Sequence, residues 1–124
     1  MKRILSNSYE RGLYAEETAL NYLIDKGLQP VDRNYHGPGG EIDLIMMDNT
    51  ILVFVEVRYR ANNHYLHALE SIDHAKCERI IRTGLHYLQK KCKSTRNPCR
   101  FDVVTICGDI NNPEIGWIKD AFQA

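Results

Sequence analysis

The sequence predicts an α/β fold in which helices pack on a central mixed sheet, in the order α-β-β-β-α-β. Two segments, 8–26 and 71–92, carry apolar residues at helical spacing. Two β-rich runs surround a short polar turn at 48–50, and a further apolar run, RFDVVTIC, covers 100–107. With 124 residues, of which 44% are hydrophobic, the chain fits one domain over residues 1–124.

The first helix is expected over residues 8–26, with Ser8 as its N-cap and Gly27 as its stop. One face is apolar, and Glu16 falls near the middle of that face, which is an unusual place for a carboxylate. Glu16 is either part of a site below the helix or a rim residue that pairs with Arg33 or Arg58. The apolar face consists of Leu13, Ala15, Ala19, Leu20, Leu23 and Ile24.

An extended segment near residues 28–35 and a Gly-rich loop over 36–40 lead into a β-hairpin. We expect its turn to be centred on Asp48-Asn49, which places Met47 opposite Thr50. The second arm is apolar almost without interruption, and this indicates a central strand that is covered on both sides.

In this register Asp43, Glu56 and Arg58 project from one face of the sheet, because side chains alternate with a period of two. Asp43 and Glu56 become diagonal neighbours, roughly 7–8 Å apart at the backbone. A shift of the register by one residue would separate them.

The second half of the chain is expected to begin with a loop over 60–70, followed by a helix over 71–92. The run 100–107 is predicted to form a second buried strand. Residues 115–118 are predicted to add a short edge strand, and Ala121 and Phe122 to pack as a tail.

Charge is distributed unevenly although the formal net charge is zero. The net charge is −4 over residues 1–57, +7 over 58–100 and −3 over 101–124. A basic segment beside an acidic one is what a metal-dependent phosphodiester enzyme needs, whereas a solvated helix end is the alternative explanation. The basic residues expected to contact nucleic acid are Arg58, Arg60, Lys76, Arg79, Lys90, Lys91, Lys93 and Arg96.

Cysteine spacing and hydropathy indicate the compartment in which the protein is expected. The four cysteines include no CxxC pair, so we expect reduced and mostly buried thiols, not a zinc site or disulfides. No run approaches the ~18 apolar residues of a membrane span, and the N-terminus lacks the apolar stretch of a signal peptide. These features favour a cytoplasmic protein without a membrane partner.

Asp43 and Glu56 are unusual in strands rich in Val, Ile and Phe, because buried charges are normally paired or bound to a metal ion. Carboxylate oxygens suit Mg²⁺ or Mn²⁺, and Arg58 beside them could contact a phosphate. The alternative is a salt bridge between Glu56 and Arg58, with Asp43 at the sheet margin.

The sequence resembles the YraN family, which is placed within the PD-(D/E)xK nuclease superfamily and is similar to archaeal Holliday junction resolvases. The resemblance rests on Gly40–Ile45, on Val53–Arg60 and on segments in the first helix and the C-terminal third. It implies a restriction endonuclease-like core. It also implies Asp43 as the metal-binding aspartate, Glu56 as the acid of the (D/E)xK signature and Glu16 as the helix glutamate.

Arg58 departs from that signature, which has lysine at this position. Arginine stays protonated above pH 12, so Arg58 can bind phosphate but cannot act as a general base. The role of Glu41 stays open between a supporting acid and a residue that points away from the site.

Three functions are consistent with these sequence features. The first is an Mg²⁺- or Mn²⁺-dependent endonuclease that acts on DNA, including branched DNA, with Glu16, Asp43, Glu56 and Arg58 as its catalytic residues. The second is a non-catalytic nucleic-acid-binding module on the same fold. The third is an assembly domain with Tyr59, Tyr65, Trp117 and Phe122 as its partner surface. By analogy, a homodimer would supply one site for each DNA strand.

Overall fold

The computed structural model describes residues 7–61, 70–93 and 97–123. The elements are α1 (Ser8–Asp25), β1 (Gln29–Gly37), β2 (Gly40–Asp48), β3 (Ile51–Arg60), α3 (His74–Tyr87), the π-helix η1 (Leu88–Cys92), β4 (Cys99–Cys107) and β5 (Glu114–Phe122). The strands form one mixed sheet in the order β1-β2-β3-β4-β5, in which only β3 and β4 are parallel. The predicted α/β class with helices on a mixed sheet is confirmed, and it is compatible with a restriction endonuclease-like core.

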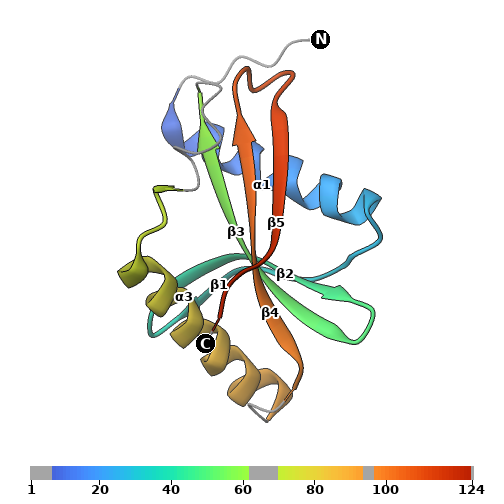
Figure 1. The fold of residues 1–124 in the computed structure, drawn as a ribbon, viewed down its shortest axis with the longest axis vertical. Helices are drawn as coiled ribbons and strands as arrows, with labels where there is room; N and C mark the ends of the chain where they lie inside the picture. The colour runs from blue at the N-terminus through green and yellow to red at the C-terminus, as the bar shows by residue number, and fades with distance from the viewer. Residues whose placement is uncertain (1–6, 62–69, 94–96, 124) are drawn as a thin grey trace.

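The two helices cover opposite faces of the sheet (Figure 1). Alternate residues of the central strand β3 separate accordingly. Val53 and Val55 join the core under α1, whereas Leu52 and Phe54 join the core under α3. The prediction that this strand is covered on both sides is therefore confirmed.

Helix α1 begins one residue earlier than the predicted cap implies. Asn7, not Ser8, is the N-cap, and its side chain accepts a hydrogen bond from the backbone N–H of Glu10 at 2.8 Å. Gly27 has φ +100° after the helix, so it is the expected stop. Of the predicted apolar face, Leu13 and Ile24 are exposed, and the remaining four residues are buried.

The hairpin register differs from the prediction by two residues. Met47 lies opposite Leu52, not Thr50, because the turn is formed by Asn49 and Thr50 with Asn49 in the left-handed region at φ 55°. A shift of two residues leaves the paired side chains of residues 44–48 and 51–55 on the predicted faces. The paired register ends at Leu44 and Val55, one residue short of Asp43 and Glu56.

The β1–β2 turn packs tightly against α3. The backbone N–H of Gly39 donates to Thr83 Oγ1 at 3.0 Å, and the same hydroxyl donates to the carbonyl of Gly40 at 3.2 Å. A Cβ atom on Gly39 would lie 2.0 Å from the backbone oxygen of Arg79. Glycine is therefore required here by the close approach of the turn to the helix.

Strand β5 is longer than the four-residue edge strand that the sequence predicts. It runs beside β4 up to Phe122, across an irregularity at Asp102. The fully buried Asp102 carboxylate accepts hydrogen bonds from Arg100, from Trp117 Nε1 at 2.9 Å and from the backbone N–H of Asp120 at 2.9 Å. These side-chain hydrogen bonds add to the backbone pairing of β4 and β5 where that pairing is irregular.

The four cysteines are free thiols, as expected, but only Cys107 is fully buried. The predicted loop over 60–70 lies mostly outside the described residues, apart from Arg60, Ala61 and Glu70. No helix among the described residues has the length and apolar character that crossing a membrane requires.

Candidate functional site

Strand β1 changes which face it presents at Asn34. Arg33 points toward α1, where its guanidinium lies 3.0 Å from Glu17, whereas Tyr35 points toward α3 and hydrogen-bonds His86 at 2.8 Å. Residues two apart in a strand normally share a face. Here they do not, because Asn34 adopts the left-handed conformation at φ 51°, which asparagine tolerates better than most residues.

Strand β2 makes the same change at Asp43, the position opposite Asn34 in the β1–β2 register. Ile42 belongs to the core under α3 and Leu44 to the core under α1. Asp43 therefore lies at the switch between the faces. Its Oδ2 accepts a hydrogen bond from the backbone N–H of Val57 at 2.8 Å, so the side chain itself links β2 to β3.

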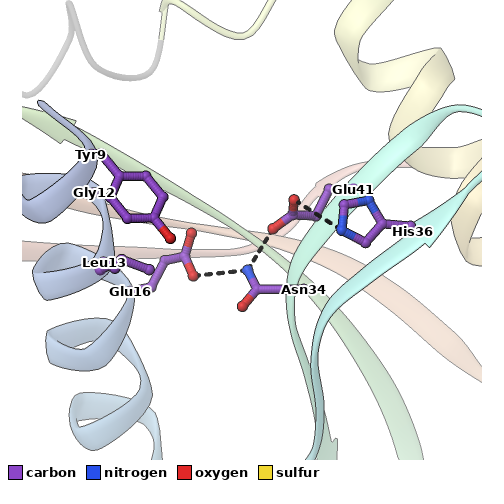
Figure 2. A pocket seen from close by; sticks show the side chains of 7 residues that line it. All are labelled: Tyr9, Gly12, Leu13, Glu16, Asn34, His36 and Glu41. Atoms are coloured by element: carbon purple, nitrogen blue, oxygen red, sulfur yellow. Dashed lines mark hydrogen bonds and ion pairs between the residues drawn. The ribbon is translucent and has the colours of Figure 1, made fainter.

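Three carboxylates converge at this switch. Glu16 from α1 and Glu41 and Asp43 from β2 each offer an oxygen, and these oxygens lie within 4.8 Å of one another. The Asn34 amide nitrogen donates to Glu16 at 2.9 Å and also to Glu41, and His36 Nε2 lies 3.6 Å from Glu41 (Figure 2). We call Glu16, Glu41 and Asp43 the acid cluster.

The acid cluster is electrostatically strained. Burial, the negative charge of Glu56 and a hydrogen bond with Glu56 raise the pKa of Asp43 well above its usual value, against the opposing hydrogen bond from Val57. Partial burial also raises the pKa of Glu16, although its hydrogen bond with Asn34 opposes the change. Carboxylates crowded in this way are unfavourable when all are ionised, and a cation among them relieves the repulsion.

Glu56 lies on the α3 face of β3, and its residue is 4% exposed. Its Oε2 lies 3.1 Å from Arg58 Nη2 and 3.8 Å from Lys76 Nζ. The expectation that Glu56 and Arg58 share a face therefore holds, and so does the salt bridge that was its alternative. Asp43 lies at the position where β2 changes faces, and its carboxyl group is close enough to Glu56 for the two side chains to share a hydrogen bond.

Glu16 reaches Asp43 from the opposite side of the sheet, together with Glu41. The structure therefore brings Glu16 and Glu56 each next to Asp43, although they approach it from the α1 side and the α3 side of the sheet. Asp43 links two groups, with Glu16 and Glu41 toward α1 and Glu56, Arg58 and Lys76 toward α3.

The predicted basic residues fall into two sets. Arg58 and Lys76 lie beside the acids, whereas the exposed Lys90, Lys91 and Lys93 lie in η1 and its C-cap, beyond the end of α3. At ~1.5 Å per helical residue they are roughly 20 Å away. Among the others, Arg60 donates to the carbonyl of its neighbour Tyr59, Arg79 is exposed on α3, and Arg96 lies outside the described residues.

The sequence did not define the roles of two residues of the site, Asn34 and Glu41. Asn34 carries no motif, and its one signal is that asparagine is favoured where a non-glycine residue has positive φ. Glu41 was visible as an acid near Asp43, but only the face switch turns it toward Glu16.

A pocket of about 450 Å³ opens beside the acid cluster (Figure 2). The first turns of α1 supply Tyr9, Gly12, Leu13 and Glu16 to one wall, and the strands supply Asn34, His36 and Glu41 to the other. The described residues of the predicted aromatic partner surface are divided between the two faces of the sheet. Tyr59 and Trp117 pack against the core under α1, Phe122 packs against the core under α3, and Tyr65 lies outside the described residues.

Comparison with known proteins gives consistent matches over most of the chain. Residues 15–106 match the sequence model of the uncharacterised protein family UPF0102. A UPF0102 protein from Nitrosococcus oceani is 46% identical over 114 residues, which cover 92% of each chain. One from Legionella pneumophila is 47% identical over 93% of this chain and 96% of its own, and one from Stutzerimonas stutzeri is 40% identical over 97% and 100%.

Proposed function

From the premise that this chain belongs to the uncharacterised protein family UPF0102, we propose that it is a metal-dependent endonuclease that hydrolyses phosphodiester bonds in DNA. The observation that carries the proposal is the acid cluster, in which three carboxylate oxygens lie within 4.8 Å of one another. The resemblance to PD-(D/E)xK nucleases supports it independently, because Asp43 and Glu56 match that signature.

The donor set fits Mg²⁺ or Mn²⁺, since all its members are hard oxygen ligands. Glu16, Glu41 and Asp43 would hold the ion, with Glu56 next to Asp43. A bound ion of this kind activates water and stabilises negative charge on the phosphate that is attacked.

The chain's own residues would orient the phosphate. Arg58 and Lys76 lie beside Glu56 and together carry more positive charge than that one carboxylate neutralises. The Arg58 side chain keeps 21% of its surface exposed, and through that part its guanidinium group would contact a phosphate oxygen. Arg58 would stabilise developing charge and would not take a proton.

The test is cleavage of end-labelled branched DNA in the presence of Mg²⁺ or Mn²⁺. We expect cleavage that chelation abolishes and that falls at least 100-fold in Asp43→Ala and in Glu56→Gln. Glu17→Gln is the matched control, because Glu17 is an exposed acid next to Glu16 on the same helix. Cleavage that persists in the Asp43→Ala, Glu56→Gln double variant would remove both residues from the mechanism.

A second candidate is a non-catalytic nucleic-acid-binding module. It is favoured by the ion pairs of Glu56, which Arg58 and Lys76 neutralise without any metal ion. This function predicts DNA binding that weakens steeply with salt but is the same with chelator and with Mg²⁺. A divalent ion requirement for binding would argue against it.

A further inference from the structure

The α1 wall of the pocket beside the acid cluster carries two large apolar side chains next to Glu16. Tyr9 and Leu13 are 74% and 43% exposed, and they follow one another at a spacing of four residues, so they share one face of α1 with Gly12. Figure 2 shows the Tyr9 side chain with its hydroxyl end directed toward Glu16. Large apolar side chains left exposed beside a pocket are typical of a binding surface.

Gly12 has no structural explanation within the described residues. It lies inside α1 with no left-handed backbone, and a Cβ atom there would meet nothing within 4 Å. Glycine in a helix interior is less stable than alanine. Its presence leaves a bare patch of helix backbone in the wall, which a flat ligand can approach closely.

Hydrogen-bond acceptors and negative charge come from both walls, with Glu16 on the α1 wall and Glu41 on the strand wall. Glu16 and Glu41 reach the pocket from two different elements, and Asn34 lies between them. Carboxylates repel a phosphodiester backbone, but they accept hydrogen bonds from the amino groups of bases. The chemistry of the two walls therefore selects a neutral, flat group that carries N–H donors.

We propose that this pocket binds one unpaired nucleobase of the DNA strand, with preference for a base that has an exocyclic amino group. That the base belongs to DNA rests on the proposed function, because Glu16 and Glu41 belong to both the acid cluster and the pocket. The base stacks on Tyr9 and lies over Gly12, and its amino group donates to a carboxylate. A pocket of about 450 Å³ holds one such group and not a duplex face, so the base must leave its helix.

The experiment measures binding and not cleavage. Fluorescence anisotropy compares two labelled duplexes, one with a single bulged cytosine and one with an abasic residue at the bulge, in Ca²⁺ instead of Mg²⁺. We expect the full chain to bind the cytosine bulge at least fivefold more tightly, in line with the effect of a base stacked on an aromatic ring. A bulged thymine should bind more weakly than cytosine.

Variants assign this preference to the pocket. Tyr9→Ala removes the stacking surface and Gly12→Leu fills the wall, so both should bind the two duplexes equally. Gly12→Leu should not lower the melting temperature, because leucine is the better helix former, and its effect is therefore not unfolding. Asn21→Leu adds the same side chain at an exposed position of α1 outside the pocket, and it should keep the preference.

Equal binding of the cytosine and abasic duplexes by the wild-type chain would overturn the inference, and so would an intact preference in both pocket variants. The proposed function fails separately. If the preference holds but Mg²⁺ and Mn²⁺ never support cleavage, the base pocket stands and the nuclease does not. If cleavage depends on Asp43 but the preference for the cytosine bulge is absent, the nuclease stands and the base pocket does not. Failure to bind any DNA would overturn both.

Discussion

Asp43 is the residue on which the site depends, and it is in an unfavourable environment as long as no cation is present. Its carboxylate accepts a hydrogen bond from the N–H of Val57. Burial and the neighbouring acids raise its pKa. The sequence identifies Asp43 through its place in a hairpin that is otherwise apolar. The face switch that brings it next to Glu16 and Glu41 follows from the backbone at Asn34.

The raised pKa of Asp43 makes stability depend on pH. Below its usual value of 3.8 the carboxyl is protonated in both the folded and unfolded states. As pH rises, the unfolded chain releases the proton first, so the free energy of unfolding falls until the raised pKa is passed. Asp43→Asn keeps an acceptor for Val57 without the charge. It should therefore raise the melting temperature at pH 7 by a few degrees, at ~1.4 kcal/mol per pKa unit.

Thermal unfolding of both chains in chelator from pH 4 to pH 8 checks this expectation. The gap between variant and wild type should widen with pH, and Mn²⁺ should close it by binding the wild-type chain. Asp25→Asn is the control at an exposed position. A gap that stays constant over this pH range would contradict the account of Asp43.

Metal binding should depend on Glu41 more than on Glu56. Glu41 belongs to the acid cluster, whereas Glu56 is neutralised by Arg58 and Lys76. We expect Glu41→Gln to weaken Mn²⁺ binding about tenfold or more, and Glu56→Gln to weaken it less. Burial raises the pKa of Asp43 and of Glu16, so the proton release that accompanies ion binding should grow as the pH is lowered, and calorimetry in two buffers of different ionisation enthalpy measures it. The opposite ranking of the two variants would place the ion nearer Glu56.

At the scale of the elements, the β1–β2 turn is positioned by its contact with α3. The sequence presented residues 36–40 as a Gly-rich loop ahead of Asp43. The structure shows that Gly39 meets the helix backbone, which holds the turn and the strand that follows it. Gly39 therefore serves packing, whereas Gly40 is explained by its positive φ of 115°.

Gly39→Ala should destabilise the protein by at least about 2 kcal/mol, because the added Cβ overlaps the carbonyl of Arg79. Gly12→Ala is the matched substitution in open space, and it should stabilise by about 0.5–1 kcal/mol. Urea unfolding of the two variants measures both effects. Equal effects of the same sign would show that close approach does not explain Gly39.

Side-chain hydrogen bonds of Asp102 add to the attachment of β5 to the sheet. Asp102→Ala leaves the Arg100 charge and the Trp117 N–H without their buried partner, and breaking a buried ion pair costs about 3–5 kcal/mol. We expect an earlier urea midpoint, together with a change in Trp117 fluorescence. Asp109→Ala, at an exposed acid beyond β4, is the control. Unchanged stability would mean that Asp48, the other partner of Arg100, neutralises the Arg100 charge without help from Asp102.

At the scale of the whole molecule, zero net charge conceals a strongly basic middle segment. The structure separates its bases into a pair at the acids, Arg58 and Lys76, and an exposed group beyond the end of α3. If both sets contact one DNA molecule, the footprint extends roughly 20 Å from the site along α3.

Replacing Lys90, Lys91 and Lys93 together with glutamine should reduce the slope of log Kd against log salt by up to about 3. Lys76→Gln should reduce that slope by about 1. Titrations between 50 and 300 mM salt measure both slopes. No change in the triple variant would exclude these three lysines from the DNA contact.

The sequence alone determined the features that depend on local periodicity. Strand alternation placed Glu56 and Arg58 on one face, and helical spacing found both helices and the anomalous Glu16. The hairpin register was wrong by two residues, because Asp48-Asn49 and Asn49-Thr50 are both acceptable turn centres. The predicted faces of the β3 side chains were nevertheless correct, because a register shift of two residues leaves each side chain on the same face.

Only the tertiary structure decided which acids meet. The positive φ of Asn34 turns β1 and β2 over at the level of Asp43, and a strand pattern with a strict period of two has no means of showing this. Glu16 then arrives from a helix far away in the chain, and Glu41 turns toward it. Such contacts arise from the packing of distant segments, and the residues that make them need no spacing in common.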